Sequence, residues 1–453
     1  MIKRTLAEIA AMVDGQIHDS MKEVVVAGVT TDTRKITNAN LFVPLQGEKS
    51  NGHDHVQQAF EQGASASFWE HNQPNPPEGT ALVFVDDSLK ALQQLAKAYL
   101  NELDTKVIGI TGSNGKTTTK DMTASILGTK YRVHKTSGNF NNHIGLPLTV
   151  LSAPEDTEML ILEMGMSSRG EISLLSKIGQ PDAAIITNIG ESHLLDLGSR
   201  EGIADAKMEI VEGLKPDGVL IYNGDEPLLI NRVTDLEIRK ISFGRSLTND
   251  YYPLKIESGQ DDMKFTIEKE GQHEFLLPVL GTHNVLNSMA AIAVGREMGV
   301  SFDEIAKGLS ELKLTNMRME VTFGAKGEKI INDAYNASPT SMKAAIELVK
   351  AMTDATKKIL VLGDMLELGP EEAAYHYKMG ELITEEIDYV LAYGNLSANL
   401  AEGAKGNLGA ERVFHFDDKQ ALVQKLKELT EPHALVLVKA SRGMRLEEVV
   451  GAL

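Results

Sequence analysis

A glycine-rich segment has the residue types and the spacing of a phosphate-binding loop. Residues 109–117 read GITGSNGKT and satisfy the pattern GxxxxGK[ST], after an apolar run and before a helical pattern. Glycines let backbone N–H groups turn toward phosphate oxygens, and the N-terminus of the helix adds positive partial charge. In this pattern Lys116 reaches the β- and γ-phosphates and the Thr117 hydroxyl holds Mg²⁺. The predicted nucleotide-binding residues of the loop are Gly109, Thr111, Gly112, Ser113, Asn114, Gly115, Lys116, Thr117 and Thr118.

A phosphate loop alone does not name the reaction, because GTPase switches, ATPase motors, kinases and ligases all use one. The run MLILEMG ends in Glu163 where a common Walker-B strand ends in Asp, and the chain has no Thr-Lys-x-Asp guanine-reading signature. Both observations weaken the GTPase interpretation. Glu163 should emerge at the carboxyl end of a strand beside the loop, where ligands bind in open α/β sheets. A helix cap or a surface carboxylate is the alternative role.

Other polar residues stand where they could serve the same nucleotide. His193 follows the apolar run AAIIT, and Lys207 lies on a helical pattern further along. Asn284, in GTHNVLNSMAA, has an amide that suits an adenine edge or a helix cap. Arg318 could neutralise a transferring phosphoryl group, and Asp333 could bind ribose hydroxyls. Taken singly, none of these residues establishes a functional role, because each could have a purely structural one.

Composition narrows the class of protein. The 453 residues include 45 Lys and Arg against 64 Asp and Glu, a formal net charge of −19. This balance argues against a nucleic-acid binder, which needs a basic surface, and it leaves room for a small phosphate pocket. The absence of Cys excludes disulfides, thiol nucleophiles and Cys-ligated metals. Charged residues interrupt any signal-peptide core and no window reaches the roughly 20 apolar residues of a membrane span, so we expect a cytoplasmic protein.

The order of the patterns predicts an α/β fold with three domains. Residues 1–103 combine a short helix, β-like runs and an amphipathic helix, as in a small α/β N-terminal domain. In residues 104–318 strand-like runs alternate with helical patterns, which indicates a central ATPase-like domain with the phosphate loop and a parallel sheet. Residues 319–453 repeat the alternation and predict a C-terminal Rossmann-like α/β domain.

Within the central region the expected strands are 107–110, 159–165, 183–190 and 219–225. The expected helices lie near 117–128, 170–178 and 201–214. Residues 251–280 read as short hairpin strands, and helices follow at 284–298 and 302–313. The C-terminal strand candidates are KIIND, KKILVLGD, YVLAYG, RVFHF and ALVLVKA.

Segments along the whole chain together resemble the Mur ligase family. They are TGSNGKTTTKDM, TSGNFNNHIGLPLTVL, LEMGMSSRGEI, TNIGESHLLDLGSREGIADAKMEI, GTHNVLNSMAA, NDAYNASPTSM, LGDMLELG and LVKASRGMRLE. The segments NFNNHIGLP and NDAYNASPTSM are typical of the member that adds D-alanyl-D-alanine to UDP-N-acetylmuramoyl-tripeptide. The Asp-Asn-Pro-Arg motif of the diaminopimelate-adding relative is absent. The phosphate loop also begins further from the N-terminus than in the related folylpolyglutamate synthases.

The resemblance implies an ATP-dependent, ADP-forming ligase that makes an amide bond through an acyl phosphate in peptidoglycan precursor synthesis. Its implied partners are small molecules, UDP-N-acetylmuramoyl-tripeptide and D-alanyl-D-alanine, and its implied state is a monomer. Two alternatives stay open at this point. One is a sister ligase that adds a single amino acid, and the other is a phosphate-loop ATPase switch whose phosphate release depends on no amine.

The resemblance also implies roles for individual residues. Lys116, His193, Lys207 and Arg318 would be catalytic, and Arg318, Asn284 and Asp333 would bind ATP. Thr117 and Glu163 would hold one Mg²⁺, and His193 would belong to a second Mg²⁺ site. Lys207 matches the lysine that becomes carbamylated, and so able to bind metal, in related ligases. Residues implied to contact the UDP-sugar or the peptide are Thr33, Arg34, Gly47, His53, Asn139, Asn142, Asn336 and Ser338, the last standing where many relatives have Asn.

Overall fold

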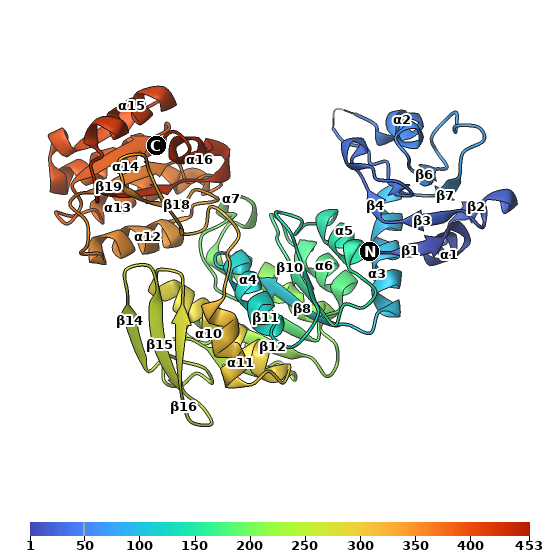
Figure 1. Cartoon of the computed structure of the whole chain (residues 1–453), viewed down its shortest axis with the longest axis horizontal. Helices are drawn as coiled ribbons and strands as arrows, with labels where there is room; N and C mark the ends of the chain where they lie inside the picture. The colour runs from blue at the N-terminus through green and yellow to red at the C-terminus, as the bar shows by residue number, and fades with distance from the viewer. Residues whose placement is uncertain (49) are drawn as a thin grey trace.

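The computed structural model describes residues 1–48 and 50–453 and contains three α/β domains in series. Figure 1 shows the N-terminal domain (blue) and the C-terminal domain (orange and red) at opposite ends of the central domain. The architecture confirms the fold class predicted from the sequence. In the central parallel sheet the structure contains two strands that the sequence patterns did not predict, β9 (Val133–Lys135) and β13 (Arg239–Phe243).

The N-terminal domain is built on a five-stranded sheet of order β2-β7-β6-β5-β4, beside the antiparallel pair β1 and β3. Its long helix α3 (Ser88–Glu102) is capped by Asp87, which accepts a hydrogen bond from the Lys90 amide. The buried face of α3 packs against α5 of the central domain, and the Tyr99 hydroxyl donates to the Ala153 carbonyl at 2.9 Å. The remaining elements are β1 (Lys3–Thr5), α1 (Leu6–Met12), β2 (Gln16–Ile17), β3 (Val25–Ala27), β4 (Val29–Thr30), β5 (Leu41–Phe42), α2 (Val56–Glu61), β6 (Ala66–Glu70) and β7 (Leu82–Val85).

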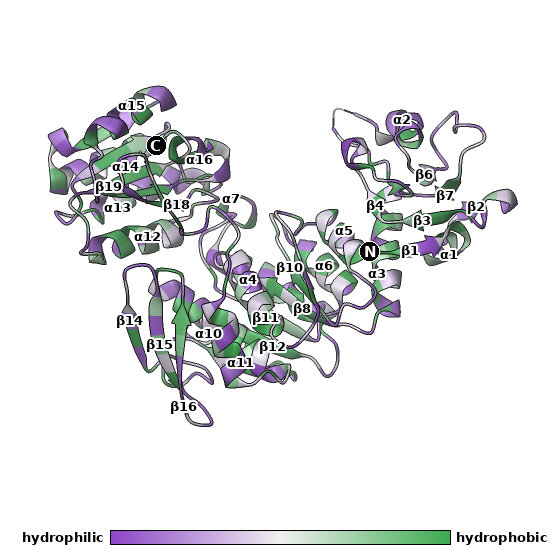
Figure 2. Cartoon of the chain, in the orientation of Figure 1, coloured by the Kyte–Doolittle hydropathy of each residue, from purple (hydrophilic) through white to green (hydrophobic). Residues whose placement is uncertain are grey.

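A parallel six-stranded sheet of order β13-β12-β11-β8-β10-β9 forms the central domain. Its inner strands are buried almost throughout, as expected for a parallel sheet covered by helices on both faces, and Figure 2 colours them as hydrophobic. The edge strands β9 and β13 are half-exposed and carry polar residues, so they lack the apolar run that marks the inner strands. The other elements are β8 (Lys106–Thr111), α4 (Lys116–Leu127), α5 (Gly145–Ser152), β10 (Met159–Glu163), α6 (Glu171–Gly179), β11 (Ala183–Ile186), α7 (Leu194–Leu197), α8 (Arg200–Met208), β12 (Val219–Asn223) and α9 (Pro227–Val233).

An antiparallel sheet and two helices complete the central region. In β15 (Met263–Glu268) buried Met263, Phe265 and Ile267 alternate with more exposed polar residues, which is the pattern of a strand with one face on a core. Helix α11 (Phe302–Ser310) packs against β16 (Gln272–Leu277) and α4. The remaining elements are β14 (Lys255–Ser258) and α10 (Thr282–Glu297).

The C-terminal domain has a six-stranded sheet of order β17-β18-β22-β19-β20-β21, in which only the edge strand β17 is antiparallel. All five predicted strands are present. The elements are β17 (Glu320–Phe323), β18 (Lys329–Asp333), α12 (Pro339–Ala351), β19 (Lys358–Gly363), α13 (Glu372–Glu381), β20 (Tyr389–Tyr393), α14 (Ser397–Leu408), β21 (Val413–Phe416), α15 (Lys419–Leu429), β22 (Leu435–Lys439) and α16 (Glu447–Val450).

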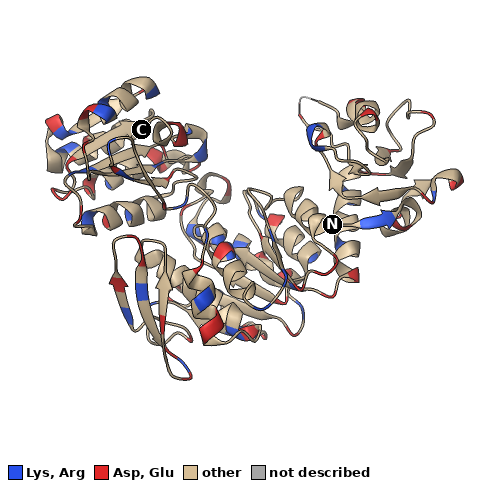
Figure 3. Cartoon of the chain, viewed as in Figure 1, with Lys and Arg blue, Asp and Glu red and all other residues tan. Residues whose placement is uncertain are grey.

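Charged residues of both signs occur on all three domains in Figure 3, interspersed rather than separated. Across the described residues, every helix is too short or too polar to cross a membrane.

Candidate active site

The phosphate loop joins β8 to α4, with Gly109 and Thr111 still in the strand and Thr118 already in the helix. Gly115 precedes α4 with φ 80°, and within the described chain no side chain caps this helix. Its first N–H groups are therefore available to an anion. Gly112 has φ 148°, and a Cβ there would lie 1.8 Å from Thr187 Oγ1. The loop thus requires glycine at this position both for its backbone angle and for space.

Residues that follow β11 hold the loop in shape. The Thr187 hydroxyl donates to the Asn114 carbonyl at 2.6 Å. The Ser113 amide donates to the Asn188 carbonyl at 3.1 Å, and the Asn114 amide donates to Asn188 Oδ1 at 2.9 Å. Sequence reasoning missed Thr187 and Asn188. Their signal was their position directly after an inner strand, the same signal that singled out Glu163.

Lys116 lies folded over the loop. Its ammonium donates to the Gly112 carbonyl at 2.6 Å and contacts the Ser113 carbonyl at 3.4 Å. Burial lowers the pKa of Lys116, the nearby Arg318 charge lowers it further, and Glu163 acts in the opposite direction. The Lys116 ammonium therefore lies at the loop, where the negative charge of an incoming phosphate would compensate for the cost of its burial.

Glu163 ends β10 next to the loop and is buried, with 2% of its surface exposed. Its carboxylate accepts hydrogen bonds from Thr117 Oγ1 at 2.8 Å and from Asn141 Nδ2 at 2.9 Å. Mg²⁺ prefers oxygen ligands and is commonly bound through one or two carboxylates together with substrate phosphates. In the described part of the chain no three His, Asp or Glu side chains form a complete metal cage. The Thr117–Glu163 pair therefore fits a Mg²⁺ ion that completes its shell with phosphate and water.

His193 and Lys207 lie near the same loop. His193, with φ 66°, precedes α7 at the junction with the C-terminal domain (Figure 1), and its Nδ1 lies 2.8 Å from Glu367 Oε2. Burial, then the Lys116 charge, lowers the pKa of His193, while Glu367 opposes the shift. Lys207 on α8 is buried, and no ion pair of its ammonium occurs within the described chain. Burial and the Lys116 charge lower the pKa of Lys207 well below its ordinary value, which favours the neutral amine.

A cavity of about 440 Å³ extends from the loop to α10 and to the C-terminal domain. Asn284 lines it, but its Nδ2 donates to the Leu280 carbonyl at 2.8 Å and its Oδ1 accepts from Asn287, so its amide is already engaged. Asp333 forms an ion pair with Lys439 and accepts a hydrogen bond from the Met319 amide at 3.2 Å. Lys439, buried at the end of β22, was not predicted.

Arg318 reaches this cavity from the linker between the two domains. Its guanidinium lies over the Tyr335 ring at 4.1 Å, and its Nε is buried without a hydrogen-bond partner in the described chain. The flanking Met317 and Met319 have φ 62° and 52°, an uncommon conformation for bulky residues. Asn114 Nδ2 is likewise buried and unpaired among the described residues. Unpaired hydrogen-bond donors on both sides of the cavity fit a polyanionic ligand such as a nucleoside triphosphate.

The C-terminal domain contacts the phosphate loop directly. The hydroxyl of Ser338, the N-cap of α12, donates to Asn114 Oδ1 at 3.0 Å. The Thr340 hydroxyl donates to Glu191 Oε2 at 2.6 Å. Asn336 also lines the cavity, and its carbonyl accepts from Lys439 at 3.1 Å.

A second cleft, of about 560 Å³, lies between the N-terminal and central domains. Asn139 and Asn142 line it from the central domain, and Asp32 and Lys35 line it from the N-terminal domain. Arg34 is exposed, and its guanidinium holds the Asp32 carboxylate with contacts of 2.9 and 2.8 Å, which lowers the pKa of Asp32 to about 2. Thr33 begins the short 3-10 turn Thr33–Lys35, to which Arg34 also belongs. Asn142 lines both cavities, so the cleft and the nucleotide cavity meet at this residue.

Five of the eight predicted substrate residues are not among those that line either cavity; they are Thr33, Arg34, Ser338, His53 and Gly47. His53 is buried, its Nδ1 contacts Asn51 Oδ1 at 2.9 Å, and its Nε2 accepts from the Glu70 amide at 3.2 Å. Its ring also packs edge-on against Trp69. Gly47 donates through its amide to the Ser50 carbonyl at 2.9 Å in a neighbouring turn.

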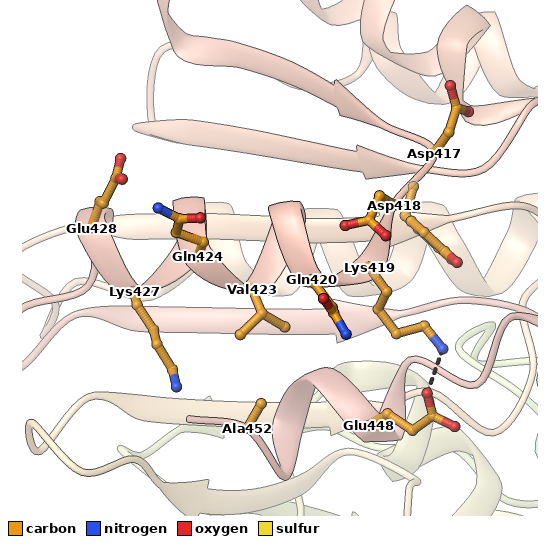
Figure 4. Close-up of a pocket in the computed structure, with 11 residues that line it drawn as sticks. Asp417, Asp418, Lys419, Gln420, Val423, Gln424, Lys427, Glu428, Glu448 and Ala452 are labelled. Atoms are coloured by element: carbon orange, nitrogen blue, oxygen red, sulfur yellow. Dashed lines mark hydrogen bonds and ion pairs between the residues drawn. The ribbon is translucent and has the colours of Figure 1, made fainter.

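A larger cavity, of about 920 Å³, lies far from these residues between α15 and α16 of the C-terminal domain (Figure 4). Lys419 in this cavity forms an ion pair with Glu448 at 2.7 Å, and the other charged side chains that line the cavity are mostly exposed. None of the predicted site residues lines it. Its volume alone does not make it the reaction site, because the free buried donors and the phosphate loop are elsewhere.

Comparison with family models covers most of the chain. Residues 25–100 match the Mur ligase family catalytic domain, residues 110–295 match the Mur ligase middle domain, and residues 317–442 match the Mur ligase glutamate ligase domain.

The chain is 56% identical to the UDP-N-acetylmuramoyl-tripeptide–D-alanyl-D-alanine ligase of Bacillus subtilis over 99% of this chain and 98% of that protein. It is 35% identical to the Escherichia coli ligase of the same name over 100% and 99% of the two chains. A crystal structure of MurF from Acinetobacter baumannii superposes with a TM-score of 0.91 at 30% identity, over 100% of this chain and 98% of that one. MurF ligase from Thermotoga maritima in complex with ADP gives 0.83 at 29% identity, over 94% and 97%. With its phosphate loop, its paired clefts and these similarities, the chain belongs to the Mur ligase family.

Proposed function

We propose that the chain is an ATP-dependent, ADP-forming ligase that adds D-alanyl-D-alanine to UDP-N-acetylmuramoyl-tripeptide. The observation that carries this proposal is the meeting of two cavities at Asn142. One cavity contains a phosphate loop, and the other is a cleft between the N-terminal and central domains. A UDP-sugar lying in the cleft would extend its peptide toward the phosphate loop. The names of the Bacillus subtilis and Escherichia coli relatives support the same substrates.

The chemistry follows from the poor reactivity of a carboxylate toward an amine. A tripeptide carboxylate oxygen attacks the γ-phosphorus of ATP, ADP leaves, and an acyl phosphate forms. The dipeptide amine then attacks the activated carbonyl, loses a proton, and expels phosphate. Both steps crowd anions together, so we assign Lys116 and Arg318 to neutralise them. Closure of the C-terminal domain would keep water from the acyl phosphate.

We propose that Thr117 and Glu163 hold one Mg²⁺ and that His193 belongs to a second site. The ions would supply positive charge next to the reacting phosphate oxygens. Lys207 would join this site as a carbamate, formed when its neutral amine attacks CO₂ and loses a proton. The lowered pKa of Lys207 supports this assignment, because only the uncharged amine is nucleophilic. His193 Nδ1 lies 2.8 Å from Glu367 Oε2, so Nε2 would be the ring nitrogen that binds a metal.

Domain roles follow the same division. We propose residues 1–103 as the UDP-sugar domain, residues 104–318 as the ATP domain and residues 319–453 as the domain that closes over both. Asp333 and Asn284 would contact the nucleoside, although both are already engaged in hydrogen bonds. Since ATP and a UDP-linked precursor are consumed, we propose a cytoplasmic enzyme that acts as a monomer.

The decisive experiment supplies the protein with UDP-N-acetylmuramoyl-tripeptide, ATP, Mg²⁺ and either D-alanyl-D-alanine or single free amino acids. Mass spectrometry of the products and parallel measurement of ADP identify the amine that is joined. The proposal expects a pentapeptide product and ADP in equal amounts, and only with the dipeptide. A product with one added amino acid would indicate a sister ligase. Phosphate release that ignores both amine and UDP-sugar would indicate an ATPase switch.

A further inference from the structure

Four charged side chains, three of them buried, form a row beside the phosphate loop, and none of the roles above uses Lys120, Asp121 or Lys135. Lys120 and Asp121 lie on α4, with side chains 1% and 0% exposed, and Glu163 beside them is 3% exposed. Lys135, on β9, is partly exposed at 38% and lines the cleft of the N-terminal domain. The row therefore runs from the metal-side carboxylate to the second cleft.

Asp121 is the most connected member of this row. Its Oδ1 accepts from Lys135 Nζ at 2.6 Å. Its Oδ2 accepts from both the amide and the hydroxyl of Thr315, each at 2.8 Å. Burial opposes the charge of Asp121, but the lysines and these hydrogen bonds keep its pKa below the ordinary value. Thr315 lies three positions before Arg318, so the same carboxylate anchors the linker that carries that arginine.

Lys120 stands between two carboxylates. Its Nζ lies 3.5 Å from Asp121 Oδ1 and 4.0 Å from Glu163 Oε2. An ammonium in direct contact with Glu163 would occupy the oxygens that a metal ion needs. Asp121 attracts the same ammonium at the shorter of these two distances and so competes with Glu163 for it.

We propose that Asp121 is a positioning residue that holds Lys120 away from Glu163 and thereby keeps this carboxylate available to a divalent cation. The inference rests on the proposed function only in taking Glu163 as the metal-side carboxylate. It differs from a purely structural role, because it makes Lys120 a competitor of the metal once the Asp121 charge is removed.

The test uses the full-length protein with ADP and measures Mn²⁺ binding by electron paramagnetic resonance. Asp121→Asn keeps an oxygen for Thr315 and removes the charge. We expect the variant to bind Mn²⁺ at least about tenfold more weakly, because an ion pair in a buried site competes strongly with a cation. Metal-free ADP affinity, measured by calorimetry, should stay within about twofold, since the loop itself is unchanged.

A second substitution separates competition from misfolding. Lys120→Met, which keeps the length of the side chain, should restore Mn²⁺ binding in the Asp121→Asn background. Lys120→Met alone should bind Mn²⁺ at least as tightly as the parent protein, and this result is informative even if Asp121→Asn does not fold. Weaker Mn²⁺ binding by Lys120→Met, or no restoration in the double variant, overturns the proposal. These measurements involve no UDP-sugar, so a failure of the ligase assay leaves them separately interpretable.

Discussion

Gly112→Ala tests whether the shape of the phosphate loop controls nucleotide binding. The new Cβ would lie 1.8 Å from Thr187 Oγ1 and 3.0 Å from Thr187 Cβ. Relief of this contact needs roughly 1.7 Å of relative movement, since non-bonded atoms settle near 3.5 Å. That movement strains or breaks the hydrogen bonds from Thr187 to Asn114 and from Ser113 to Asn188, each worth about 1 kcal/mol. The unfavourable φ adds about 1–3 kcal/mol.

We expect ADP affinity to fall at least about 100-fold, because the two hydrogen bonds and the backbone strain together amount to at least about 3 kcal/mol, and each 1.4 kcal/mol is a factor of ten. Isothermal titration calorimetry measures the affinity, and thermal unfolding shows that the domain remains folded. Gly79→Ala is the matched control, since Gly79 has φ 69° and nothing within 4 Å of the added Cβ. It should lose about 1 kcal/mol of unfolding free energy and keep its ADP affinity.

Thr187→Ala supplies the second arm, because it removes the oxygen that the new Cβ meets. If the clash is the cause, the effects of Gly112→Ala and Thr187→Ala on ADP affinity will be smaller together than their sum. Additive effects, or an unchanged affinity in Gly112→Ala, would refute the steric reasoning.

Three other predictions concern charge. Lys116→Ala should keep the thermal unfolding temperature but cut the ligation rate by at least about 100-fold, and unchanged turnover would remove Lys116 from the mechanism. If Lys207 is a carbamate, removal of CO₂ and bicarbonate should inactivate the enzyme, and adding bicarbonate back should restore its activity. A short carboxylic acid should likewise restore activity to Lys207→Ala. If neither addition restores activity, the carbamate assignment is wrong. Burial lowers the pKa of His376, whose Nε2 accepts from the Met365 amide at 2.9 Å. The unfolded chain binds this proton near pH 6.5 and the folded chain only at lower pH, so the free energy of unfolding should decrease as the pH is lowered from about 6.5. The dependence of this free energy on pH should be weaker in His376→Gln, and an equal dependence in the two proteins would refute the prediction.

The sequence predicted the parts of the site that depend on neighbours in the chain. The glycines, Lys116 and Thr117 are adjacent, and Glu163 is marked by the buried strand that it ends. The three-domain α/β fold was predicted for the same reason, because alternating apolar runs report on each local element. The edge strand β9 carried no such run, and with it the position of Lys135 was missed.

Contacts between distant segments left no local signal. Lys439 pairs with Asp333, 106 positions away, and Glu367 approaches His193 from the other domain. The left-handed backbone at Met317 and Met319 was also unpredictable, because methionine has no preference for that conformation. The reverse occurs at His53, for which the family resemblance implied a substrate contact, because its ring contacts Asn51, Glu70 and Trp69 instead.

The nucleotide cavity takes its walls from two domains, with the phosphate loop on one side and Arg318 and Lys439 on the other. A ligand held by both walls becomes part of the joint between two separately folded bodies. By mass action such a ligand would stabilise only the form in which the two domains are joined, so we expect them to unfold together when nucleotide is bound. Without nucleotide, the two domains would lose this shared stabilisation and could unfold at different temperatures.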